Sequence, residues 1–271
     1  MIEYLPFIAA LLAVGAGAGL IAGLFGIGGG VVMVPAMYFV LSALGYDDTA
    51  MHAAVGTSLA VIVVTSLRSV MAHAGRGAVD FQVIKAWAPW IVLGTFIGAA
   101  VADYAPGRAL TALFGGVALL LSAQFFFGRP DWKLADDLPG LPLSGVLGAF
   151  IGTLSALMGI GGGVFGVTLM TVCGRAIHTA VATSAGFGVA IGLPGAVGYM
   201  IAGLDEAGRA PFSVGYVNFA GFACLAGAAV FLAPVGAALA HRLNAARLKQ
   251  AFAIGLLIVA LNMIREAVMG G

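Results

Sequence analysis

Long apolar runs separated by short polar stretches follow one another along almost the whole chain. Several of these runs exceed the roughly 20 residues that a helix needs to cross the ~30 Å hydrocarbon core of a bilayer. The pattern therefore predicts an all-α membrane protein with about ten transmembrane or re-entrant helices. Their expected ranges are 4–25, 30–45, 49–73, 81–103, 107–127, 143–158, 163–175, 178–203, 213–240 and 246–268.

Composition supports this picture and excludes other classes of protein. Hydrophobic residues make up 62% of the 271 positions and charged residues only 8%, whereas an average soluble domain has about 25% charged residues. The net charge of +1 creates no basic field that would attract nucleic acid, so we expect no nucleic-acid partner. Two cysteines are too few for a metal cluster, and we expect neither a metal nor another cofactor.

Two motifs occur twice in the same order, which indicates an internal repeat. Residues 26–31, with the sequence GIGGGV, return at 159–164 after a shift of 133 positions. Residues 52–58, with the sequence HAAVGTS, return at 178–184 as HTAVATS after a shift of 126 positions. In a chain this apolar, a doubled motif interrupted by glycines is typical of a membrane transporter with its site between two halves.

The repeat extends over most of both halves. Residues 77–81 align with 215–219 at a shift of 138 positions. We therefore divide the chain into a first repeat of residues 1–128, a proline-containing linker of 129–142 and a second repeat of 143–271. Five predicted segments fall on each side of the linker. Because an odd number of crossings turns the second half over, we expect an inverted repeat with a pseudo-two-fold axis in the membrane plane.

Basic residues are distributed unequally between the two predicted sides of the membrane. Nine of the twelve lie on one side and three on the other. The richer side is expected to face the cytoplasm, which puts both termini on the outer side. The nine are Arg68, Arg76, Lys85, Arg129, Lys133, Arg175, Arg242, Arg247 and Lys249, and the three are Arg108, Arg209 and Arg265.

Two predicted segments, 30–45 and 163–175, are too short to span the bilayer, and each follows a glycine-rich break. A helix that starts inside the membrane presents unpaired N–H groups and a partial positive charge, and glycine lets an anion come close. We therefore predict that the two helix starts jointly bind one anion near the midplane. The alternative is that the glycines only permit close helix packing. The candidate residues are Gly28, Gly29, Gly30, Gly161, Gly162 and Gly163.

Two Thr-Ser pairs recur at equivalent positions of the following helices, Thr57 with Ser58 and Thr183 with Ser184. Each pair lies about 8 Å further along its helix than the matched histidine. Their hydroxyls could donate hydrogen bonds to sulfite, sulfonate or carboxylate oxygens without adding charge. The alternative is a hydroxyl that bonds back to its own helix, as is common in membrane helices.

Three further residues are candidates for a gate or for attracting an anion. His52 and His178 lie at the starts of their helices, near opposite faces of the membrane, where they could respond to pH or draw an anion in. The alternative is that they cap or pack at the interface. Arg68 lies in an otherwise apolar helix, where a cation either serves function or extends toward the nearer surface.

The doubled motifs together form a distinctive pattern. They comprise Gly19, the run from Gly23 to Gly30, Pro35, Ala54, Gly56, Thr57 and Ser58, and in the second copy the run from Gly159 to Gly163, Ala182, Thr183 and Ser184. These residues resemble the TauE/SafE sulfite exporter family, also called the toluenesulfonate uptake permease (TSUP) family, over nearly the whole chain. The second copy departs from the first, with Gly166 and Thr168 where the first has Met33 and Pro35.

The resemblance implies a multi-pass secondary transporter of the bacterial inner membrane, with sulfite or an organosulfonate such as sulfoacetate as its substrate. Alternating access is the expected mechanism. No G-x-x-x-x-G-K-[ST] loop is present, so a gradient would drive transport, and a proton is the simplest coupling ion. A channel for the same anions is one alternative. A membrane-embedded enzyme is another, although the sequence has neither a G-x-S-x-G elbow nor a His-rich metal motif.

Overall fold

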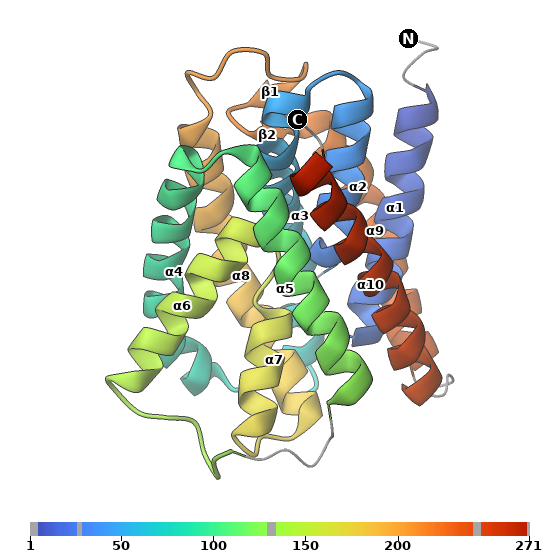
Figure 1. Cartoon of the computed structure of the whole chain (residues 1–271). Coiled ribbons are helices and arrows are strands. Elements are labelled where there is room, and N and C mark those ends of the chain that lie inside the picture. Colours follow the sequence, from blue (N-terminus) through green and yellow to red (C-terminus); the bar gives the residue numbers. More distant parts are fainter. Residues whose placement is uncertain (1–4, 26–28, 129–133, 241–244, 270–271) are drawn as a thin grey trace.

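The computed structural model describes residues 5–25, 29–128, 134–240 and 245–269. Within these residues the chain forms ten helices and one two-stranded hairpin (Figure 1). The helices are α1 (Leu5–Phe25), α2 (Gly30–Ala43), α3 (Asp47–Ala74), α4 (Phe81–Tyr104), α5 (Gly107–Phe127), α6 (Leu143–Met158), α7 (Gly163–Val172), α8 (Ile177–Ala202), α9 (Phe219–Ala240) and α10 (Ala245–Met269). The strands are β1 (Ser213–Val214) and β2 (Val217–Asn218).

The prediction of an all-α membrane protein is confirmed. Six of the helices in the described residues, α1, α3, α4, α5, α8 and α10, are long and apolar enough to cross a membrane. The helices that follow the glycine breaks are short, with 14 residues in α2 and 10 in α7. At 1.5 Å per residue these two reach only about 21 Å and 15 Å, less than the thickness of the hydrocarbon core.

The expected helix over 213–240 is wrong at its start. Strands β1 and β2 occupy residues 213–218 as an antiparallel hairpin, and α9 begins only at Phe219. Gly215 turns the chain with a φ of 54°, in the left-handed region that glycine tolerates. The Asn218 side chain then accepts a hydrogen bond from the backbone N–H of Gly221 and so starts the helix. A short apolar run does not distinguish such a hairpin from a first helical turn.

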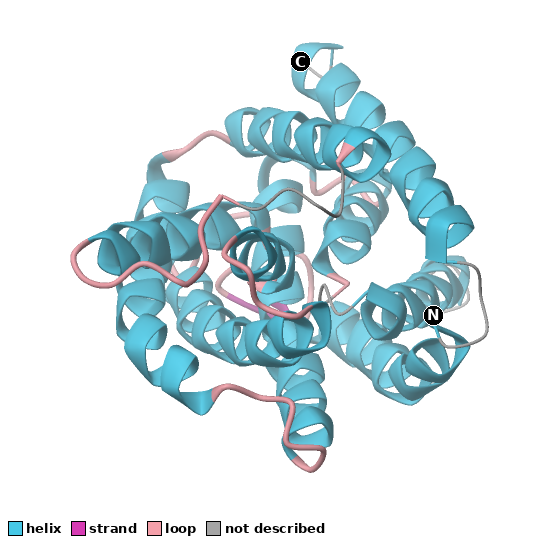
Figure 2. Cartoon of the chain, turned by 90° about the horizontal axis from the view of Figure 1, so that it is seen from below, coloured by secondary structure: helices cyan, strands magenta, loops and turns pink. Residues whose placement is uncertain are grey.

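The helices associate in pairs that cross the boundary between the two halves of the sequence. Helix α1 packs along α9, α4 along α6, α5 along α10, and α3 along α8. Helix α3 is the most enclosed of the six long apolar helices, with 78% of its most hydrophobic stretch buried. The view from below shows a bundle built almost wholly of helices, with the short strands near the middle of the view (Figure 2).

Glycines allow the closest of these approaches. A Cβ at Gly15 or Gly19 of α1 would lie 2.7 Å or 2.6 Å from a backbone oxygen of α9. In the α4–α6 pair, Gly94 faces the carbonyl of Ala149 and Gly152 faces the carbonyl of Ile91, with no room for a Cβ at either glycine. Because hydrophobic burial drives helix association little within lipid, close van der Waals packing of this kind has to hold the pairs together.

The short helices lie in opposite halves of the bundle. Helix α2 lies toward the end that carries the β-hairpin, the start of α1 and the end of α10, whereas α7 lies toward the end that carries the described part of the linker (Figure 1). Both short helices therefore begin at a middle level and run outward to different ends. This arrangement brings the two glycine breaks to the interior.

Gly152→Ala should destabilise the protein by about 1–3 kcal/mol, because the added methyl group would overlap backbone atoms of Ile91 and Thr95 that cannot rotate away. The matched control is Gly116→Ala, since nothing lies within 4 Å of a Cβ placed there. The control should be neutral or stabilising by up to about 1 kcal/mol, the difference in helix propensity. Thermal unfolding of detergent-purified protein measures both, and equal midpoints would contradict the packing described here.

Candidate functional site

The two glycine breaks meet in the interior of the protein. Gly29, with a φ of 73°, precedes α2, and a Cβ at Gly30 would lie 2.5 Å from the carbonyl oxygen of Gly159. The start of α2 therefore packs directly on the break between α6 and α7. Gly28 lies outside the described residues. The other five predicted glycines, Gly29, Gly30, Gly161, Gly162 and Gly163, are all buried.

Within the described part of the chain, neither helix start is capped by a side chain. Gly29 and Gly162 occupy the N-cap positions of α2 and α7, and no described side chain accepts a hydrogen bond there. The first N–H groups of an α-helix have no partner within the helix, and they carry the positive end of its dipole. The two starts can therefore offer N–H donors to a small anion.

The space around the second break is filled in this structure. A Cβ at Gly161 would lie 3.2 Å from the side chain of Ile62, and one at Gly162 would lie 2.8 Å from both Phe187 and Ile191. These apolar side chains come from α3 and α8. An anion could reach the second break only if these apolar side chains moved away from the glycines.

Three of the four Thr and Ser hydroxyls have partners in the other half of the sequence. The Oγ of Ser58 donates to the carbonyl of Gly159 at 2.8 Å. The Oγ1 of Thr57 accepts from the backbone N–H of Asn218 at 2.9 Å, and the Oγ1 of Thr183 accepts from the backbone N–H of Asp80 at 3.0 Å.

The fourth hydroxyl, on Ser184, differs from the other three. It is fully buried and has no hydrogen-bond partner among the residues that the structure describes. It lies beside the first turn of α7, because a Cβ at Gly166 would come within 2.7 Å of its Oγ. It is therefore a free donor next to one of the two helix starts.

Asp80 and Asn218 were not among the site residues predicted from the sequence. Each caps its helix through its side chain: Asp80 accepts from the N–H groups of Gln82 and Val83, and Asn218 accepts from that of Gly221. Each also donates its own N–H to a threonine of the other half. The alignment of residues 77–81 with 215–219 pairs these two positions, so the signal was present in the sequence.

His52 is buried and holds the end of α4. Its Nε2–H donates to the carbonyls of Ala102 at 3.0 Å and Ala105 at 3.1 Å, and its ring stacks on Tyr216 at a centroid distance of 4.8 Å. Burial and the neighbouring carboxylate of Glu206 raise the pKa of Tyr216 to about 12. The tyrosine therefore stays neutral at physiological pH, and its hydroxyl donates to Glu206.

The other two gate candidates lie on the outside. His178, in the first turn of α8, and Arg68, in the second half of α3, are both exposed. The structure therefore does not bring them to the glycine breaks. Among the described residues, no Lys, Arg, Asp or Glu is buried, so the interior polar groups are hydroxyls, the Asn218 amide and His52.

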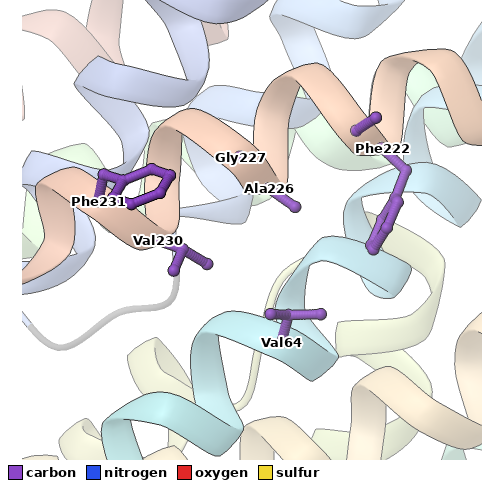
Figure 3. Close-up of a pocket in the computed structure, with 7 residues that line it drawn as sticks. Val64, Phe222, Ala226, Gly227, Val230 and Phe231 are labelled. Atoms are coloured by element: carbon purple, nitrogen blue, oxygen red, sulfur yellow. The ribbon is translucent and has the colours of Figure 1, made fainter.

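An open apolar groove separates the middle of α3 from α9, with a volume of about 290 Å³. Figure 3 shows Val64 on α3 directed toward α9, and Phe222, Ala226 and Val230 on α9 directed toward α3. Among the residues that the structure describes, no polar side chain lines this groove.

One family profile and several relatives match this chain. The profile of the family described as "Sulfite exporter TauE/SafE" matches residues 11–263. A "Probable membrane transporter protein" of Haemophilus influenzae is 33% identical over 95% of this chain and 98% of its own length. The probable membrane transporter protein YunE of Bacillus subtilis is 28% identical over 95% and 97% of the two chains.

A probable membrane transporter protein of Methanocaldococcus jannaschii is 28% identical over 80% of each chain. No solved structure matches this chain. The family match spans nearly all of the sequence, and the relatives are similar over most or all of their own lengths. The chain is therefore a multi-pass membrane transporter that belongs to the sulfite exporter TauE/SafE family.

Proposed function

We propose that the protein is a secondary transporter that moves a small sulfur-containing anion, sulfite or an organosulfonate such as sulfoacetate, across the bacterial inner membrane by alternating access. The observation that carries the proposal is that the uncapped start of α2 packs, in the protein interior, on the glycine break that leads into the uncapped start of α7. The name of the matched family supports the sulfur anion as the substrate class.

An inverted repeat is part of the proposal, and four equivalent features support it. The hydrogen bond from Asn218 to Thr57 corresponds to the one from Asp80 to Thr183 after the sequence shifts of 138 and 126 positions. The hydrogen bond from Tyr216 N–H to Tyr199 corresponds in the same way to the one from Ala78 N–H to His73. Gly77 and Gly215 both have a positive φ, and the pairing of α1 with α9 corresponds to that of α6 with α4.

The anion would be bound by neutral donors. We place it against the first N–H groups of α2 and α7, at the glycines 28–30 and 161–163, with the Ser184 hydroxyl beside it. Thr57, Ser58 and Thr183 would act by holding the breaks and the capped starts of α4 and α9 in place, since their hydroxyls are already bonded there. Because no buried cation is used, binding would stay weak enough to release the anion on the far side.

The packing around the breaks favours a carrier over a channel. A channel needs a continuous wet path, whereas Ile62, Phe187 and Ile191 pack against the glycines of the second break. Movement between two closed arrangements is then required for each transported anion. We take the proton as the coupling ion to be tested first. Exposed His178 and Arg68 could attract the anion at the predicted cytoplasmic entrance.

Ser184→Ala should weaken binding of sulfite about 10-fold or more, because a hydrogen bond to a charged group is worth about 1.5–3 kcal/mol. Saturable counterflow of radiolabelled sulfite in proteoliposomes measures this loss, and sulfoacetate tests the alternative substrate. In the unaltered protein, the same ligands should raise the melting temperature.

The matched control is Ser58→Ala, at the equivalent position of the first half. The Ser58→Ala substitution should mainly lower the melting temperature, because the buried Gly159 carbonyl loses its hydrogen-bond partner at a cost of about 1–3 kcal/mol. The proposal is contradicted if Ser184→Ala transports with unchanged affinity, or if no sulfur anion shows counterflow in the unaltered protein.

The membrane orientation gives a separate prediction. Leu134, in the linker, and Asp205, in the loop before the hairpin, are both exposed. The described part of the linker and this loop lie at opposite ends of the bundle (Figure 1). With Cys173 and Cys224 replaced by alanine, Leu134→Cys should react with an impermeant maleimide only from the cytoplasmic side, because basic residues collect there. Asp205→Cys should react only from the periplasmic side. The reverse result would overturn the proposed periplasmic position of both termini.

A further inference from the structure

We propose that two helix–helix contacts, which we call the α3–α9 seam and the α4–α8 seam, alternate during transport, so that one opens while the other closes. The structure holds the α4–α8 seam closed and the α3–α9 seam open. This inference rests on the proposed transport function and on the inverted repeat. It identifies which contacts change and which helices move.

Each seam has an equivalent hydrogen bond at one end, from a backbone N–H to a threonine hydroxyl. At one end of the α3–α9 seam, the N–H of Asn218 donates to Thr57, and at the other end of the bundle the N–H of Asp80 donates to Thr183 in the α4–α8 seam. Both threonines are fully buried. Each bond satisfies the N–H of a helix-capping residue that has no helical partner, so each fixes the start of one helix to the side of another.

Beyond the hydrogen bond from Asp80 to Thr183, the α4–α8 seam stays closed along its length. The side chain of Ile84 packs on Gly186 so closely that a Cβ there would overlap it. Further along α8, a Cβ at Gly195 would lie 3.3 Å from the methyl group of Thr95. Closer to the end of α8, a Cβ at Gly198 would lie 2.7 Å from the Cβ of Ala99. The contacts therefore extend over about four turns of α4.

The α3–α9 seam is open beyond the hydrogen bond from Asn218 to Thr57. Phe222 is the equivalent of Ile84, and Ala60 is the equivalent of Gly186, by the same sequence shifts. Phe222 lines the open groove together with Val64, seven residues beyond Thr57, and with Val230 (Figure 3). The groove of about 290 Å³ thus occupies the place where the other seam is filled by side chains.

Closing the groove is physically reasonable because both of its walls are apolar. Val64, Ala226 and Val230 could pack together without burying an unpaired polar group. Opening the other seam would expose Ile84 and Ala99, which are also apolar. The two arrangements therefore exchange similar contacts, and two states of similar free energy are what a reversible carrier needs.

The close helix pairs indicate which units move. Helix α9 is packed on α1 through Gly15 and Gly19, and α4 is packed on α6 through Gly94 and Gly152. In the middle, α3 and α8 lie against one another along their lengths, with Gly192 against the backbone of Leu59 and Val63. We therefore assign the movement to the α1–α9 and α4–α6 pairs, each rocking against the central α3–α8 pair.

Engineered cysteine pairs at equivalent positions test the exchange. In a protein that carries Cys173→Ala and Cys224→Ala, one variant combines Ile84→Cys with Gly186→Cys, and the other combines Ala60→Cys with Phe222→Cys. Copper phenanthroline should oxidise the first pair at least about 10-fold faster in detergent, because only that seam is closed. Each disulfide should stop sulfite counterflow in proteoliposomes, and dithiothreitol should restore it.

Removal of one of the two threonine hydrogen bonds tests the coupling between the seams without any substrate. Thr183→Val removes one buried hydrogen bond, so it should slow oxidation of the Ile84→Cys/Gly186→Cys pair about fivefold and speed the other pair by a similar factor. Thr57→Val is the matched control, and it should not slow oxidation of the first pair. Gel filtration and melting temperature establish that each variant is folded.

Equal oxidation rates of the two pairs would overturn the assignment of the open seam. An unchanged rate for the Ala60→Cys/Phe222→Cys pair in the Thr183→Val protein would overturn the exchange. If the cysteine-free parent shows no counterflow of sulfite or sulfoacetate, the proposed function fails instead. The oxidation rates are still decisive for the seams in that case, because they need no substrate.

Discussion

The ends of helices in a membrane protein leave backbone N–H and carbonyl groups that must find partners within the protein, and this constraint shapes the whole bundle. Two of these groups, on Asp80 and Asn218, reach threonines of the opposite half. The carbonyl of Gly159, at the break itself, is satisfied by Ser58 of the opposite half. Each half therefore completes the broken backbone of the other, and neither half would satisfy its own polar groups alone.

The same constraint leaves a small number of donors free. The uncapped starts of α2 and α7 and the hydroxyl of Ser184 have no side-chain partner among the described residues. They lie among apolar neighbours in which no charged side chain of the described part is buried. An anion that displaces Phe187 or Ile62 would find neutral donors in a region of low polarity, where hydrogen bonds are strong but an unpaired group is costly.

Much of the fold could be predicted from the sequence because its signals are local. The glycine triplets, the lengths of the apolar runs and the doubled motifs indicated the breaks, the ten helices and the equivalence of Thr57 and Thr183 in the two halves. The hairpin before α9 could not be predicted, since it depends on the turn at Gly215 and on the Asn218 cap. The partner of each threonine also escaped prediction, because a hydroxyl that could bind an anion is equally able to accept an N–H from another helix.

His52 shows the same limit for the gate candidates. Its position at the start of a long helix indicated an interfacial residue, but only the fold places the end of α4 and Tyr216 against its ring. The two matched histidines consequently have different surroundings, one buried and one exposed. Sequence equivalence therefore predicted the position of these residues along their helices but not what they contact.

Selenite offers the most direct measurement of the central claim, because it is a heavier oxyanion of the same shape and charge type as sulfite. An experimental structure of the protein with selenite, phased or checked by the anomalous signal of selenium, would locate the bound anion. We expect one site within hydrogen-bond distance of the N–H groups at Gly30 or Gly163, with Phe187 or Ile62 displaced. Selenium found only in the α3–α9 groove or at the surface, in crystals grown at a saturating selenite concentration, would contradict it.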